Sequence, residues 1–216
     1  MKSCGKYVGN IDKLYSTYVT AFKSGRDIVT NEFYESSICN LLRCFSVNLG
    51  LNVFSYGFSD DTERSLIAFS MGDENISIFD DVAKVLKISY NNKFNSLSHR
   101  DFLGSIMSLG FTRDKMGDLI LEGNCAYVPV VIDFVEYIIQ NLKKVRNVPI
   151  SVSLELFNRL PQKRFEILYK VVASLRIDGI VSALTNLSRE KSKNLIQNSK
   201  VKLNGISELD VDTKVC

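Results

Sequence analysis

Apolar residues recur at three- and four-residue intervals in two N-terminal stretches, residues 7–24 and 32–47. An α-helix turns once every 3.6 residues, so this spacing places the apolar side chains on one face of a helix. In the second stretch the apolar stripe consists of Phe33, Ile38, Leu41, Leu42 and Phe45. The pattern predicts a helical N-terminal unit over residues 1–50.

The pattern then changes to short runs rich in β-branched and aromatic residues, which are typical of strands. Such runs occupy residues 51–56 and 65–69, on either side of a turn-rich segment, and residues 85–90. A helix is predicted next, because Ser98 is a favourable N-cap and Asp101, three residues further on, completes a capping-box-like pair. These elements begin a second domain.

The rest of this domain is predicted to contain a hairpin around a Glu-Gly-Asn turn, a helix and a last strand. These elements fall at residues 118–121, 126–131, 133–145 and 149–154. From residue 85 onward the order is therefore strand, helix, strand, strand, helix, strand. That order is the ferredoxin-like arrangement, which RNA-recognition domains also use. We predict an α+β domain of this kind over residues 51–156.

The net charge of +3 is unevenly distributed along the chain. Between residues 143 and 202, 13 basic residues stand against 4 acidic ones, which gives a local net charge of +9. Such a stretch favours binding to a polyanion, and a solvated basic face without a partner is the alternative. In this prediction residues 157–175 form a basic connector and residues 176–216 a small C-terminal domain.

The C-terminal domain is predicted to contain a short helix, a tight turn, a second helix and a hairpin strand. Ser188 is placed to cap the second helix. Basic residues follow in its first turns, where free backbone N–H groups and the helix dipole favour a phosphate. The basic residues of this helix and of the strand after it are Arg189, Lys191, Lys193, Lys200 and Lys202.

Three short motifs in this domain, Arg-Ile-Asp, Ser-Arg and Val-x-Leu-Asn-Gly, occur at intervals that resemble the alpha-L RNA-binding module. The resemblance covers residues 176–205 and implies that the domain binds RNA. Ser199 stands where that family usually has glycine, and the chain ends at Cys216, before the closing strands of the family's module. The predicted RNA-binding residues are Arg176, Ser188, Arg189, Lys191, Lys193, Lys200, Lys202 and Asn204.

A wider resemblance, to the YlmH family, covers about residues 55–205. It is carried by residues 88–94, 98–110, 113–118 and 172–178. The resemblance implies a bacterial protein with an N-terminal unit, a central RNA-recognition-like domain and a C-terminal alpha-L domain, which binds structured RNA. Members have been linked to stalled large ribosomal subunits that carry peptidyl-tRNA, and older naming links the gene neighbourhood to cell division.

The central domain also carries aromatic and basic residues that can stack on bases or contact phosphates. The predicted secondary RNA-binding residues are Tyr90, Lys93, His99, Arg100, Arg113 and Lys115. His99-Arg100-Asp101 matches part of a kinase catalytic loop, but Ile106 stands where that loop requires asparagine. The match is therefore interpreted as the start of a capped helix.

The predicted function is non-enzymatic: binding to ribosomal RNA and the large ribosomal subunit, with peptidyl-tRNA as a further partner, in rescue or quality control of stalled complexes. An RNA-modifying enzyme with an unrecognised catalytic site and a cell-division-linked interaction scaffold are the alternatives. Altered nucleosides in ribosomal RNA would support the enzyme, and migration apart from ribosomes would support the scaffold.

No cofactor is predicted, because no phosphate-cradling glycine motif occurs. The 5 cysteines include no Cys-x-x-Cys pair and the chain has 1 histidine, so free thiols and no metal site are expected. No apolar run reaches the roughly 18 residues of a membrane span, and the N-terminus does not resemble a signal peptide. We therefore expect a cytoplasmic monomer that does not interact with membranes.

Overall fold

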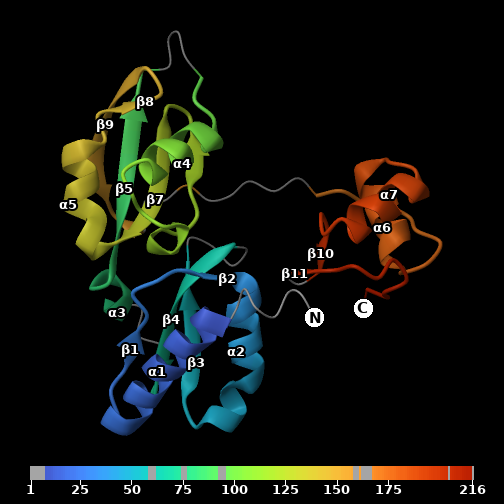
Figure 1. The fold of residues 1–216 in the computed structure, drawn as a ribbon, viewed down its shortest axis with the longest axis horizontal. Coiled ribbons are helices and arrows are strands. Elements are labelled where there is room, and N and C mark those ends of the chain that lie inside the picture. The colour runs from blue at the N-terminus through green and yellow to red at the C-terminus, as the bar shows by residue number, and fades with distance from the viewer. Residues whose placement is uncertain are drawn as a thin grey trace. The chain divides into compact units, whose positions relative to one another are not determined.

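The computed structural model describes residues 8–57, 62–73, 77–91, 96–157, 161, 167–203 and 205–215, without the side chains of 8–10 and 44–49 (Figure 1). The chain divides into two compact units, Met1–Lys163 and Arg164–Cys216. None of the helices in this described part is long and apolar enough to cross a membrane.

The first unit begins with an α+β region built around one buried strand. Its elements are α1 (Val8–Ser24), β1 (Ile28–Val29), β2 (Tyr34–Glu35), α2 (Ser36–Leu49), β3 (Asn52–Tyr56) and β4 (Arg64–Ser70). Strand β4 pairs antiparallel with β3 and also with β1 and β2. The second helix begins at Ser36 rather than at residue 32, because Tyr34 and Glu35 pair with β4.

The strand pairing differs from the predicted grouping at one point. Strands β3 and β4 do form an antiparallel pair, but they share a sheet with β1 and β2 and not with the central domain. The physical reason is that both faces of β4 are buried. Ile67 and Phe69 pack in a core with α1 and α2, whereas Leu66 and Ala68 pack in a second core with Phe79.

The central part of the first unit has a five-stranded sheet. Its elements are α3 (Ser77–Asp80), β5 (Ala83–Tyr90), α4 (His99–Met107), β6 (Ile120–Glu122), β7 (Cys125–Val131), α5 (Ile132–Asn141), β8 (Lys144–Val145) and β9 (Val148–Glu155). The sheet order is β6-β7-β5-β9-β8, and each neighbouring pair is antiparallel. Without the short β8, this is the strand order of the ferredoxin-like arrangement. The predicted α+β class is confirmed.

Helices α4 and α5 pack against this sheet through a common apolar core. Leu86 and Ile88 of β5 contribute to it with Phe102 of α4 and Ile138 of α5, and all four are fully buried. The predicted capping box is present, since Ser98 Oγ accepts from the Asp101 amide at 3.4 Å and Asp101 Oδ2 accepts from the Ser98 amide at 2.9 Å. The cap sets the first residue of α4.

A short joint connects the two sheets of the first unit. The Phe33 amide, next to β2, donates to the Asp114 carbonyl at 2.7 Å, and the Gly117 amide donates to the Pro129 carbonyl of β7 at 2.9 Å. Gly117 has no room for a side chain, because a Cβ atom there would lie 2.9 Å from the Phe33 ring. The buried Asp118 carboxylate accepts from the Glu63 amide at 2.7 Å. The backbone at residues 114–118 therefore fastens one sheet to the other.

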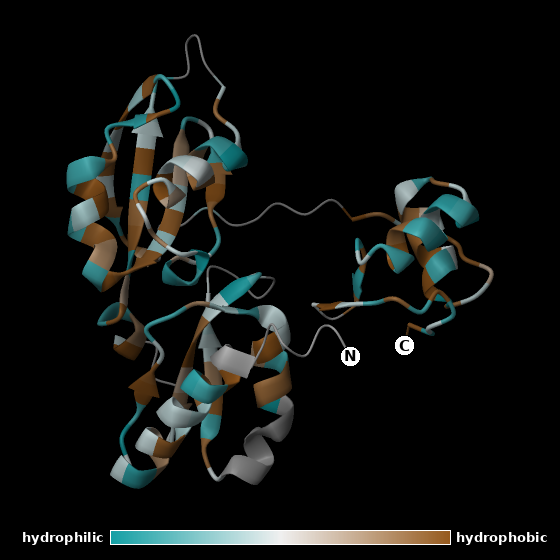
Figure 2. Cartoon of the chain, in the orientation of Figure 1, coloured by the Kyte–Doolittle hydropathy of each residue, from teal (hydrophilic) through white to brown (hydrophobic). Residues whose placement is uncertain are grey.

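The second unit is small. It contains α6 (Ile177–Thr185), α7 (Arg189–Gln197), β10 (Lys202–Leu203) and β11 (Ile206–Ser207), in the predicted order of two helices and a hairpin. Ile177, Val181 and Ile196 are its buried core. Figure 2 shows that β4, β5 and β7 carry mainly hydrophobic residues, whereas α7 is mostly hydrophilic. Helix α7 therefore presents a polar surface for most of its length.

Helix α7 ends in a Schellman motif with serine at the left-handed position. The Lys200 amide donates to the Leu195 carbonyl and the Ser199 amide to the Ile196 carbonyl, both at 2.9 Å. Ser199 has a φ of 57°, the conformation that the motif requires. The turn is thus formed without glycine, although a side chain makes this conformation less favourable.

Ser199→Gly is expected to raise the free energy of unfolding of the second unit by about 0.5–1 kcal/mol. Relief of the left-handed strain outweighs the added freedom of the unfolded chain. Thermal unfolding of the full chain, followed by hydrogen exchange at α7 amides, measures the change. Asn198→Gly is the matched control, because Asn198 has a φ of −90° and the same substitution there should be neutral or destabilising. Equal effects at both positions would contradict the explanation.

Candidate nucleic-acid interface

The described RNA-binding residues predicted in the second unit extend from the N-cap of α6 through α7 to β10. Ser188 caps the helix, since its Oγ accepts from the Lys191 amide at 3.3 Å. The cap satisfies one of the free N–H groups of the first turn, and the others remain directed out of the helix. The N-terminus of α7 is therefore electropositive through its backbone as well as through its side chains.

The three cations of α7 do not share one face. Arg189 and Lys193 are four residues apart and lie on the same side of the helix. Lys191 is two residues from each, which places it roughly 200° around the axis, on the opposite side. Ser192 and Ile196 form the buried face. A ligand that contacts both Lys191 and Lys193 must therefore span much of the exposed surface of the helix.

Two of the predicted cations are engaged with a buried carboxylate. The Asp178 side chain is 1% exposed and accepts from Arg176 Nε and Nη2, both at 3.2 Å. Arg189 Nη2 lies 3.6 Å from the same carboxylate, and Arg176 also forms an ion pair with Asp212. Hydrogen bonds from Arg176, and then its positive charge and that of Arg189, hold the pKa of Asp178 below its ordinary value. Arg176 and Arg189 therefore position α6 relative to α7.

The lysines of the second unit, unlike these two arginines, do not contact a buried carboxylate among the described residues. Lys191, Lys200 and Lys202 are exposed and Lys193 is half-buried. Across residues 167–203 and 205–215, none of these four lysines forms an ion pair with a carboxylate. Their charges are thus available to an external anion. Asn204, also predicted to bind RNA, lies outside the described residues.

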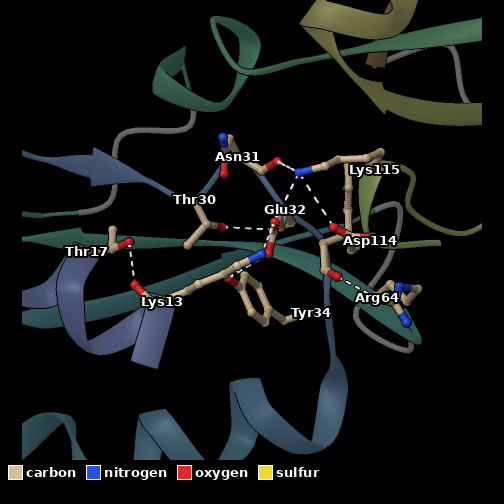
Figure 3. Close-up of polar contacts among 10 residues, drawn as sticks. Lys13, Thr17, Thr30, Asn31, Glu32, Tyr34, Arg64, Asp114 and Lys115 are labelled. Carbon is tan, nitrogen blue, oxygen red and sulfur yellow. Dashed lines mark hydrogen bonds and ion pairs between the residues drawn. The ribbon is translucent and has the colours of Figure 1, made fainter. Parts of the chain in front are cut away.

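Two of the predicted secondary residues belong to the joint between the sheets, and Figure 3 shows the contacts of one of them, Lys115. Lys115 Nζ donates to Glu32 Oε1 at 3.1 Å and to the Asn31 carbonyl at 3.4 Å. Arg113 Nη1 donates to the carbonyl oxygens of Met116 and Gly117 at 2.9 and 2.7 Å. These contacts give both cations a structural use within the protein.

The other secondary residues are spread over the central domain. His99 and Arg100 are exposed on the first turn of α4. Tyr90 is half-buried and its ring centroid lies 5.8 Å from that of Phe102. Lys93 lies outside the described residues. The structure therefore brings the C-terminal lysines into one small unit, whereas the secondary residues do not form a comparable cluster.

Sequence reasoning did not identify two features of the first unit. One is the Glu32 carboxylate, which Lys13 contacts at 2.6 Å and Lys115 at 3.1 Å. The other is a pocket of about 430 Å³ whose lining includes Tyr56, Lys84 and Phe157. Both are formed by residues far apart in the chain. Among the local sequence features, Glu32 directly precedes the two aromatic residues Phe33 and Tyr34, which does not reveal its distant partners.

Comparison with known proteins identifies the central domain. Residues 80–158 match the family model described as "Putative RNA-binding domain in YlmH". The ribosome-associated protein quality control protein P2 of Bacillus subtilis (strain 168) is 29% identical over 123 residues, or 56% of this chain. The alignment spans 48% of that relative, about half its length. The resemblance of the chain to YlmH-type proteins is confirmed.

A solved structure agrees with the fold. The cell division protein ylmH from Streptococcus pneumoniae superposes with a TM-score of 0.57 and 23% sequence identity, over 71% of this chain and 93% of that one. At this level of identity the likeness concerns the fold. It supports the α+β architecture described above.

Asp178→Asn is expected to lower the unfolding temperature of the second unit by several degrees, because both arginines lose their shared carboxylate. The pKa of Asp178 is lowered by folding, so its contribution to stability is complete above the ordinary value of 3.8 and is lost as the pH falls through the lower folded-state value. The unfolding temperature, measured as a function of pH, should therefore decrease less steeply below pH 3.8 in the variant than in the unmodified chain. An unchanged pH profile would contradict the assignment.

Lys115→Met is expected to lower the free energy of unfolding of the first unit by about 1–3 kcal/mol, because it removes one partner of the buried Glu32 carboxylate. RNA affinity of the folded variant should be unchanged. Denaturant unfolding and RNA titration measure the two quantities. Lys13→Met is the control: the Lys13 side chain is 60% exposed, so its loss should cost at most about 1 kcal/mol. Weaker RNA binding at unchanged stability would restore Lys115 to the RNA-binding surface.

Proposed function

We propose that this chain is a non-enzymatic RNA-binding protein that docks on ribosomal RNA of the large subunit, with tRNA as a second ligand, in the quality control of stalled complexes. The observation that carries this proposal is the set of lysines in the second unit. Lys191 and Lys193 lie in the first two turns of α7, Lys200 and Lys202 follow the end of that helix, and in the described part of the chain none of the four forms an ion pair with a carboxylate.

This arrangement suits the phosphate backbone of a folded RNA. Lysine side chains contact phosphates as point charges, and the free N–H groups at the start of α7 donate hydrogen bonds to a further anionic oxygen. These contacts carry no base information, so recognition in this unit depends on the shape and the backbone of the RNA. Affinity should accordingly fall steeply as the salt concentration rises.

The name of a relative supports the ribosomal part of the proposed function. The Bacillus subtilis protein is described as ribosome-associated and as a quality control protein, and residues 80–158 of this chain match a model described as a putative RNA-binding domain. A second RNA contact in the central domain is consistent with a ligand that contains both ribosomal RNA and tRNA. Arg113, Lys115 and Asp118 form structural contacts, with backbone groups and with the Glu32 carboxylate, and the proposal assigns them no catalytic role.

The double variant Lys191→Glu, Lys193→Glu is expected to bind purified large subunits at least roughly tenfold more weakly, because two phosphate contacts become repulsive. The slope of log affinity against log salt should flatten by about one to two, since each lost phosphate contact contributes about 0.9. Filter binding at several salt concentrations and sedimentation through sucrose gradients measure both effects.

The matched control is Lys143→Glu, Lys144→Glu, which changes the net charge equally at two exposed lysines of the first unit. The control should bind nearly as well as the unmodified chain. If both double variants lose affinity equally, attraction by overall charge explains binding and the specific site is wrong. If neither does, the second unit does not carry the ribosomal contact.

A further inference from the structure

The first unit contains a pocket that has no part in the RNA contact proposed for the lysines of the second unit. Its volume is about 430 Å³, within the range of small-ligand sites. Strand β3, helix α3, strands β5 and β9 and the segment after β9 all contribute residues to its lining. The lining residues are Tyr56, Asp80, Lys84, Val85, Glu155, Leu156 and Phe157.

Aromatic rings form one wall of this pocket. The Tyr56 ring stacks on Phe79, with centroids 4.8 Å apart and planes 21° apart. Phe157 meets Tyr56 at 5.0 Å in an edge arrangement. Phe79 is fully buried and therefore fixes the Tyr56 ring, whereas Tyr56 and Phe157 are only partly buried. A rigid, partly exposed pair of rings favours a flat ligand, which stacks on an aromatic face at little entropic cost.

Charged groups of both signs lie beside the rings. Glu155 already has a partner, because its Oε2 lies 3.6 Å from Lys87 Nζ. Among the described residues, Asp80 and Lys84 are in no ion pair. Asp80 lines the same pocket as Tyr56, and burial, followed by the negative charge of Asp80, raises the pKa of Tyr56. The pocket therefore offers an aromatic wall, a carboxylate with two acceptor oxygens and a cation.

We propose that this pocket binds an unpaired guanosine nucleotide of single-stranded RNA. The base packs against the aromatic wall formed by Tyr56 and Phe157. Asp80 accepts hydrogen bonds from the N1–H and N2–H groups of guanine, and Lys84 contacts the adjoining phosphate. Guanine is the base whose Watson–Crick edge offers two adjacent donors to one carboxylate, while adenine, cytosine and uracil each present an acceptor there. Lys84 disfavours a basic peptide as the occupant. The site extends the proposed function and does not depend on the lysines of α7.

Fluorescence anisotropy of the full chain with labelled five-nucleotide RNAs tests this site. UUGUU should bind roughly tenfold or more tightly than UUAUU, UUCUU or UUUUU, the discrimination expected of a bidentate base contact. Asp80→Asn should abolish the preference, while Asp81→Asn, an exposed neighbour with the same change of charge, should keep it. Lys84→Ala should weaken binding of all four RNAs and Lys84→Arg should retain it, which separates loss of the contact from misfolding.

Equal affinity for the four RNAs, or a guanosine preference that survives Asp80→Asn, would overturn the proposal. So would binding of a lysine-rich peptide in place of RNA. The variant Lys191→Glu, Lys193→Glu should bind UUGUU as the unmodified chain does. Loss of large-subunit binding in that variant with UUGUU binding intact supports both sites. Retained large-subunit binding would contradict the lysine site, and loss of UUGUU binding would contradict an independent pocket.

Discussion

The placement of the two sheets in the first unit depends on one buried carboxylate. The Glu32 side chain is 9% exposed, and it is stabilised by Lys13 of α1 and Lys115 of the joint (Figure 3). The Tyr34 hydroxyl donates to its second oxygen at 3.3 Å. A buried charge without these partners would be strongly destabilising, so the segments that carry them must come together. The walls of the aromatic pocket, from β3 and β5, are held in place by the same constraint.

The second unit also contains a buried carboxylate that is held by cations, and this contact determines which cations remain available to RNA. Asp178 accepts a bidentate pair of hydrogen bonds from Arg176, for which the planar guanidinium is better suited than an ammonium group. The lysines nearby have no such partner among the described residues. In both units the buried carboxylates therefore separate the cations that hold the fold from those that can meet a ligand. Charge density along the chain does not make that distinction.

Local patterns predicted most of the secondary structure, including the Ser98 capping box and the Ser188 cap, because their determinants lie within four residues. The ferredoxin-like strand order also followed from the order of elements. The pairing of β4 with β1 and β2 did not, since apolar residues on both its faces fit several sheets. The use of Lys115 was equally hidden, because Glu32 lies 83 residues away. Contacts of that kind are decided by tertiary packing, which periodicity does not encode.

The two proposed RNA contacts differ in their physics, and the difference makes them complementary. Phosphate contacts of the α7 lysines act on any folded RNA of suitable shape and weaken with salt. The aromatic pocket reads one base through stacking and hydrogen bonds, which salt screens much less. Because one chain carries both, engagement of the second unit raises the effective concentration of RNA at the pocket. A pocket that binds a short oligonucleotide only weakly can therefore still select where on a large RNA the protein docks.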